Sequence, residues 1–90
     1  MAVIWIPSLL RDLTAGRERV HCEGATVRDV IENLELSYHG VRARLIDAVG
    51  GQIQPNIAVV VDGEVSLLGL LERVSETSEV HFIPAIAGGA

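Results

Sequence analysis

The chain has 90 residues, of which 49% are hydrophobic and 21% charged, enough for one small packed domain and incompatible with an intrinsically disordered chain. Its seven basic residues are all arginine and face 12 acidic residues, which gives a formal net charge of −5 and no cationic cluster to hold phosphates. Nucleic acid is therefore excluded as an expected partner. A single cysteine, Cys22, and the lack of any apolar run near the ~20 residues that span a bilayer lead us to expect a cytoplasmic protein with no membrane partner.

The first half of the chain predicts two strands and a helix. Residues 2–6 are rich in β-branched and aromatic side chains, and residues 17–23 alternate between apolar and polar, so both predict strands. Residues 26–36 begin with Thr26, which precedes Asp29 by three positions as in a capping box, and then carry apolar residues at helical spacing. We expect this segment to be the main helix, with one face on the core.

The second half predicts a short helix followed by three strands. Residues 41–49 keep a helical register up to a Gly-Gly pair. Residues 56–61 are apolar at every position after the first, which predicts the strand at the centre of the sheet, and the Asp-Gly pair behind them predicts a hairpin into 64–68. Residues 69–74 favour a turn of helix, and 79–85 alternate as a final strand.

This order of elements predicts a single domain over residues 1–90 of the α+β class. A mixed sheet of four or five strands with one main helix packed on one face is the simplest way to bury the apolar sides of these elements. Residues 85–90, Ala-Ile-Ala-Gly-Gly-Ala, carry no charge, and we expect them to form a flexible tail that reaches ~20 Å when extended. The reactive group that such a tail delivers is its own terminal carboxylate.

Five stretches, taken in order, resemble the ThiS/MoaD family of ubiquitin-like sulfur carriers over essentially the whole chain. They are Ile6–Arg11, Thr26–Glu35, Tyr38–Asp47, Asn56–Glu64 and Val80–Gly89. The helix stretches and the Pro-Ala-Ile-Ala-Gly-Gly ending look most like MoaD-type carriers of cysteine biosynthesis. The resemblance implies a β-grasp, ubiquitin-like fold.

The resemblance further implies a carrier protein that is not an enzyme and has no catalytic residue. An E1-like adenylating enzyme would use ATP to convert the carboxylate of Gly89 into an acyl-adenylate, from which sulfide or a persulfide displaces AMP. The resulting thiocarboxylate would donate its sulfur to a sulfur-accepting synthase. Ala87 and Gly88 would give the partner access to Gly89, and this chain would bind no cofactor beyond the covalent sulfur.

The chain departs from the family pattern at Ala90, because the family activates a terminal glycine. We therefore expect a peptidase, such as a metalloprotease that trims ubiquitin-like precursors, to cleave between Gly89 and Ala90. Two further roles within the family remain open, the small subunit of molybdopterin synthase and a thiamine-type carrier. A role of another class also remains open, that of a ubiquitin-like protein modifier or interaction module.

Few other residues are candidates for chemistry. Cys22 is either a nucleophile or sulfur relay, or a core residue, and the strand face it shares with Val20 favours the core. The three histidines lack metal-ligand spacing, so we expect no metal site. The large aromatic residues Trp5, Tyr38 and Phe82 are expected in the core, although Phe82 or its neighbour on the open face of the sheet is a candidate anchor for a partner.

Overall fold

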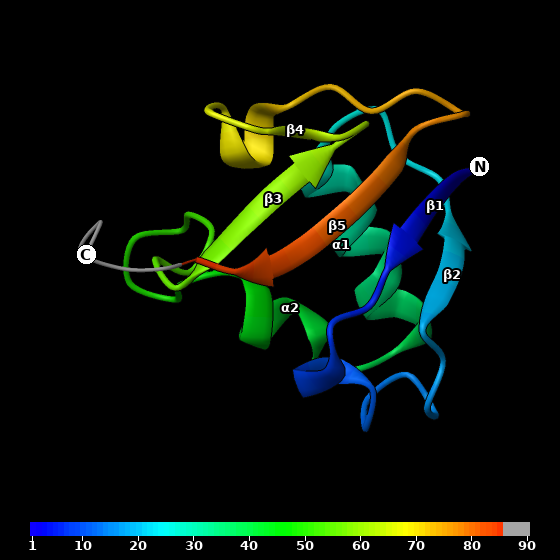
Figure 1. Ribbon diagram of the computed structural model, residues 1–90. Helices are drawn as coiled ribbons and strands as arrows, with labels where there is room; N and C mark the ends of the chain where they lie inside the picture. The colour runs from blue at the N-terminus through cyan, green and yellow to red at the C-terminus, as the bar shows by residue number, and fades with distance from the viewer. Residues whose placement is uncertain (86–90) are drawn as a thin grey trace.

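The computed structural model describes residues 1–85. Five strands, two α-helices and two short 3₁₀ helices follow one another along this part of the chain (Figure 1). They are β1 (Ala2–Trp5), η1 (Ser8–Leu10), β2 (Arg19–Cys22), α1 (Val27–Ser37), α2 (Val41–Leu45), β3 (Ile57–Val61), β4 (Glu64–Val65), η2 (Gly69–Leu71) and β5 (Glu79–Pro84). The expected α+β class with one main helix is confirmed, and no helix among residues 1–85 is long and apolar enough to cross a membrane.

The strands form one mixed sheet in the order β2-β1-β5-β3-β4. β5 lies parallel to β1 and antiparallel to β3, so the last strand of the chain occupies the centre. The expectation that residues 56–61 form the central strand is therefore wrong. β3 has β5 on one side and only the two-residue β4 on the other, and just one of its residues, Val59, is buried.

The main helix covers one face of the sheet, behind the strands in Figure 1. Its cap is the one predicted from the sequence: the backbone N–H of Asp29 donates to Oγ1 of Thr26 at 3.3 Å. The Asp29 carboxylate reaches back to the N–H of Ala25, also at 3.3 Å, one residue before the N-cap. The first bond pairs a backbone donor that the first turn would otherwise leave unsatisfied, and the second pairs the backbone N–H that precedes the cap.

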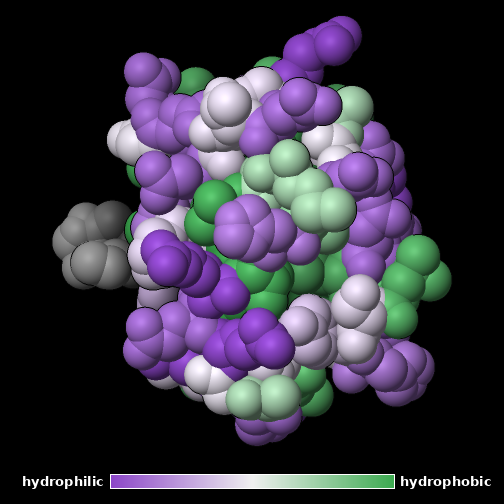
Figure 2. Space-filling view, turned by 90° about the vertical axis from the view of Figure 1, so that its right-hand side faces the viewer, coloured by the Kyte–Doolittle hydropathy of each residue, from purple (hydrophilic) through white to green (hydrophobic). Residues whose placement is uncertain are grey.

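The core lies between this helix and the sheet. The strands contribute alternate residues, and α1 contributes positions three and four residues apart. Fully buried members include Ile4, Val27, Val30, Ile31, Leu34, Val41, Leu45, Val80 and Phe82. Hydrophobic residues also reach the surface between hydrophilic ones, as Figure 2 shows for the side of the molecule that carries β1 and β2.

Two expected elements are shorter than the sequence suggested. α2 ends at Leu45 because Ile46 turns to an extended conformation, buries its side chain and bridges to Ile53. β4 ends at Val65 because the hydroxyl of Ser66 accepts hydrogen bonds from the backbone N–H groups of Leu68 and Gly69, both at 3.1 Å. These bonds turn the chain into η2 in place of a longer strand.

Candidate functional site

The residues expected to carry and expose the reactive carboxylate lie outside the described residues: Ala87, Gly88, Gly89 and Ala90. The structure does describe the point from which they extend, at the end of β5. Pro84 is in register with Ile57 of β3, and Ala85 donates its backbone N–H to the carbonyl oxygen of Asn56 at 2.8 Å. Ala85, the last described residue, is thus still hydrogen-bonded to the residue that precedes β3.

The strand that holds this segment is the best-anchored one in the sheet. β5 is paired along both edges, and its Val80 and Phe82 side chains are at most 2% exposed. The five residues beyond Ala85 span at most ~18 Å when extended.

The face of the sheet opposite the helix carries an aromatic pair. The indole of Trp5 on β1 stacks on the imidazole of His81 on β5, with ring centroids 5.3 Å apart and planes 6° from parallel. Arg19 on β2 places its guanidinium carbon 5.7 Å from the indole centroid, and the indole Nε1–H donates to the carboxylate of Glu79 at 3.0 Å. The expectation that Trp5 serves the core is wrong, since strand alternation turns Ala2 and Ile4 to the helix and Trp5 away from it.

Apolar side chains continue this open face toward the end of β5. Ile83 follows His81 by two residues and is 40% exposed. Ala58 and Val60 of β3 lie opposite Ile83 and His81, respectively, and are half-buried. The stacked pair and this apolar row therefore share the open face of the sheet.

Phe82 does not belong to that surface. It is 2% exposed and faces the helix-covered side of the sheet, so the expectation that Phe82 itself sits on the open face is wrong, while its expected place in the core is confirmed. The odd and even residues of β5 point to opposite faces. Its neighbour Ile83 is the residue that reaches the open face.

Cys22 is a core residue, as its strand face predicted. It is 7% exposed, and its Sγ lies 3.5 Å from the carbonyl oxygens of Val30 and Glu23. Burial, with a smaller contribution from the negative charge of Glu23, raises the pKa of the thiol above its usual value. The sulfur is therefore held as a protonated, poorly nucleophilic thiol at neutral pH.

The three histidines lie on separate elements. His21 is exposed on β2, His39 sits 2.9 Å from the carboxylate of Glu35, and His81 stacks under Trp5. Within residues 1–85, no three side chains of the His, Cys, Asp and Glu types come together as a metal site.

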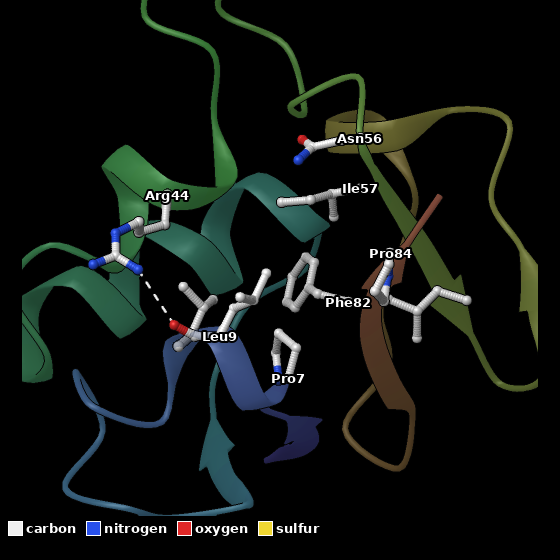
Figure 3. A pocket seen from close by; sticks show the side chains of 9 residues that line it. Pro7, Leu9, Arg44, Asn56, Ile57, Phe82 and Pro84 are labelled. Atoms are coloured by element: carbon white, nitrogen blue, oxygen red, sulfur yellow. Dashed lines mark hydrogen bonds between the residues drawn. The ribbon is translucent and has the colours of Figure 1, made fainter. Parts of the chain in front are cut away.

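A groove of about 220 Å³ opens at the same end of the sheet (Figure 3). It is lined by Pro7, Leu9, Leu10, Arg44, Asn56, Ile57, Phe82, Ile83 and Pro84. These residues come from the β1–η1 corner, α2, the start of β3 and the end of β5. Sequence reasoning missed the groove because no local pattern brings four separate segments together.

Comparison with known proteins identifies the family. The ThiS family model matches residues 4–89, nearly the whole chain. The chain belongs to the ThiS family. This confirms the resemblance drawn from the sequence.

The curated relatives similar to this chain include a sulfur carrier protein and a protein modifier. The sulfur carrier protein CysO of Mycobacterium tuberculosis is 33% identical over 87 residues, covering 93% of this chain and 94% of CysO. The small archaeal modifier protein 3 of Haloferax volcanii is 35% identical over 69 residues, covering 74% of this chain and 73% of that protein.

Two solved structures share the fold of this chain. A chain of the BexX/CysO complex of Amycolatopsis orientalis superposes with a TM-score of 0.88 at 32% identity, covering 99% of this chain and all of that one. Mycobacterium tuberculosis CysO superposes with a TM-score of 0.89 at 29% identity, covering 96% of this chain and all of CysO. The β-grasp, ubiquitin-like fold expected of this ThiS family member is therefore confirmed.

Proposed function

We propose that this protein is a sulfur carrier whose C-terminal Gly88-Gly89 is adenylated by an E1-like enzyme and converted to a thiocarboxylate. The sulfur then passes to a synthase that forms cysteine or a related metabolite. The observation that carries the proposal is the family match, which runs through the fold and ends at Gly89. The relatives named sulfur carrier proteins, aligned over more than nine-tenths of the chain, support it.

The chemistry asks little of the carrier itself. The Gly89 carboxylate attacks the α-phosphorus of ATP and releases pyrophosphate, forming an acyl-adenylate. Hydrosulfide then adds to the acyl carbon and expels AMP, which leaves a thiocarboxylate. A carboxylate is a poor acyl donor and the mixed anhydride is a good one, so activation and sulfur transfer are the partner's work. Because ATP and thiols are maintained in the cytosol, we place the protein there.

The described part of the chain supplies what a tail-bearing carrier needs. The segment leaves from a central strand, and an open face with the Trp5–His81 stack and Ile83 adjoins its origin. We propose this face as the surface on which the adenylating enzyme docks. Aromatic residues that are held rigidly lose little conformational entropy on binding, and such residues dominate interface energies.

In the proposed mechanism Ala90 must be removed before Gly89 carries the terminal carboxylate. We propose that a peptidase, of the metalloprotease type that trims ubiquitin-like precursors, cleaves after Gly89. The end of the family match at Gly89, one residue before Ala90, supports this order of events.

The test is intact-mass analysis of the protein recovered from its native cells and of chains loaded in vitro with the adenylating enzyme, ATP and sulfide. Three chains are compared: residues 1–90, residues 1–89, and residues 1–89 with Gly89→Ala. We expect replacement of one oxygen by sulfur in residues 1–89 only, and loss of Ala90 in the native sample. Thiocarboxylation of the intact 90-residue chain at the same rate would refute the processing step, and failure of all three would refute the carrier role.

The modifier protein of Haloferax volcanii among the relatives favours a second candidate function, conjugation to other proteins. In that case the adenylate is attacked by the ε-amine of a partner lysine in place of hydrosulfide. Mass spectrometry of trypsin-digested lysate proteins for lysines bearing residues 74–89, the remnant left by cleavage after Arg73, separates the two functions. A permanent role as the small subunit of a molybdopterin synthase would instead appear as stable co-purification with a larger subunit.

A further inference from the structure

The outer edge of β2 is not paired by the sheet. β2 is the terminal strand, with β1 on one side and, within residues 1–85, no strand on the other. The backbone N–H of Ile6 donates to the carbonyl oxygen of Glu18 at 2.8 Å, and the β1–β2 register continues from this pair. Because bonds alternate along an antiparallel ladder, the N–H and C=O groups of Arg19 and His21 point away from β1. Such an edge is a template for one more strand.

A pocket of about 320 Å³ lies along this edge, between β2 and α1. Both sides of the pocket contribute polar side chains: Arg17, Arg19 and His21 from β2 and the residues before it, and Asn33, Ser37 and Tyr38 from α1 and its C-cap. No carboxylate of residues 1–85 lines it. Figure 2 faces the side of the molecule that carries β2, where hydrophilic side chains surround a patch of hydrophobic surface. The lining is therefore suited to an anionic group.

The two arginines of this pocket are not neutralised by the carboxylates around them. Other arginines each lie 3.1 to 3.9 Å from a carboxylate oxygen, namely Arg11, Arg28, Arg42 and Arg44. Arg17 and Arg19 form no such pair within residues 1–85, and Glu18 between them is paired with Arg11. Arg19 instead lies over the Trp5 indole. The edge of β2 is thus a local cationic site on a chain whose net charge is −5.

We propose that the free edge of β2 binds an extended acidic segment of a partner protein, which adds to the sheet as a further strand and pairs its carboxylates with Arg17 and Arg19. In this mode the outward backbone groups of Arg19 and His21 supply affinity, and the arginines select acidic side chains at alternate positions of the segment. A second copy of this chain fits less well, because pairing through its own β2 would bring two arginine-bearing edges together. The proposal does not rest on the carrier role.

The test titrates the isotope-labelled chain with a capped peptide in which glutamate and valine alternate, without adenylating enzyme, ATP or sulfur. We expect saturable binding that weakens with added salt, slower hydrogen exchange of the Arg19 and His21 amides, and nuclear Overhauser contacts between peptide amides and β2. Arg17→Gln should lower the affinity about threefold, the effect of losing one exposed ion pair. Arg17 is exposed and precedes β2, so the variant should stay folded.

Arg73→Gln is the matched control, because Arg73 is also exposed but lies outside the pocket. It changes the net charge by the same amount and should leave the affinity unchanged. An effect of Arg17→Gln no larger than that of Arg73→Gln would overturn the proposed pairing.

Two altered peptides test the site without changing the protein. Glutamine in place of glutamate should weaken binding, because the carboxylates that pair with the arginines are lost. N-methylation of the peptide amides that face β2 should abolish binding, because the added strand loses its donors. Equal binding of either altered peptide would overturn the proposal, as would no saturable binding of the acidic peptide. Inorganic phosphate that slows exchange of the Arg19 and His21 amides as strongly as the peptide would overturn it too, since the site would then hold only a simple anion.

Discussion

Trp5 and His81, which are 76 positions apart in the sequence, stack face to face on neighbouring parallel strands at 5.3 Å. The parallel pairing of β1 with β5 brings them together, and the same pairing puts β5 at the centre of the sheet. The stack therefore marks the open face at the strand from which the C-terminal segment leaves.

If the open face docks the adenylating enzyme, Trp5→Ala in residues 1–89 should lower ATP–pyrophosphate exchange with that enzyme by tenfold or more, the loss typical of a buried interface aromatic. The isolated carrier should stay folded, because Trp5 lies outside the core. Leu67→Ala, which removes an exposed apolar side chain from the loop after β4, should leave exchange unchanged. Equal effects of the two substitutions would contradict docking through the aromatic stack.

The N-cap of α1 should be measurable as stability. Thr26→Ala removes the oxygen that accepts from the Asp29 N–H and should cost about 1 kcal/mol of unfolding free energy in urea denaturation. Thr26→Ser keeps an acceptor at the same place and should recover most of this loss. A Ser variant as unstable as the Ala variant would mean that the methyl group, not the cap, matters at this position.

Glu35 should make the stability of the α1–α2 turn depend on pH. The backbone N–H groups of Arg42 and then Gly40, with a smaller contribution from His39, hold the pKa of its carboxyl below the usual value. Because the folded pKa is the lower one, the stabilisation is complete above the unfolded value of about 4.3 and is lost as the pH falls through the folded pKa.

Glu35→Gln, which keeps an acceptor oxygen but removes the charge, isolates this effect. Urea midpoints of the two proteins should differ near neutral pH and converge as the pH falls through the folded pKa of Glu35, which lies below the unfolded value. Glu32→Gln is the control, since the Glu32 carboxylate contacts Arg28 and Arg42 side chains and caps no backbone group. A difference for Glu35→Gln that is constant with pH would exclude the charge as its cause.

Asp62 closes the loop that leads into β5. Its carboxylate accepts from the buried Ser78 hydroxyl and from the Glu79 N–H, both at 2.9 Å, and its own φ is +51°. Asp62→Gly should cost about 1 kcal/mol for the lost hydrogen bonds, and Asp62→Ala about 2 kcal/mol, because alanine adds strain at positive φ. Thermal unfolding of both variants measures the difference. Equal losses would show that the positive φ at this position adds no strain to alanine.

The parts of the fold that could be predicted from sequence are those set by neighbours along the chain. The helix cap at Thr26 and the alternation of Val80 and Phe82 are local signals, and the structure confirms both. The centre of the sheet depends on which distant strands pair, and the apolar residues of 56–61 gave no information on that. Ala58 and Val60 are small enough to be half-exposed on the open face, so their hydrophobicity does not require another layer of the protein to cover them.

The features of the candidate site likewise separate into those that local sequence indicates and those that depend on long-range pairing. The family resemblance points to Gly89, which lies outside the described residues, whereas the stack and the groove depend on long-range strand pairing. Large aromatic side chains are highly buried on average, which predicts Trp5 in the core. Its position is decided by the register of β1, in which a shift of one residue exchanges the two faces.

The last prediction concerns the sulfur atom that the protein already contains. If Cys22 relayed sulfur to the C-terminal segment, its thiol would have to be an accessible thiolate, whereas burial keeps it protonated against the Val30 carbonyl. We therefore expect residues 1–89 with Cys22→Ala to accept sulfur on Gly89 as fast as residues 1–89 without the substitution, with a stability loss of about 1 kcal/mol from the smaller side chain. The native thiol should also react with a disulfide reagent far more slowly than the urea-unfolded thiol. Loss of thiocarboxylate formation in a folded Cys22→Ala protein would instead support a role of Cys22 as sulfur relay, because a packing effect would not account for it.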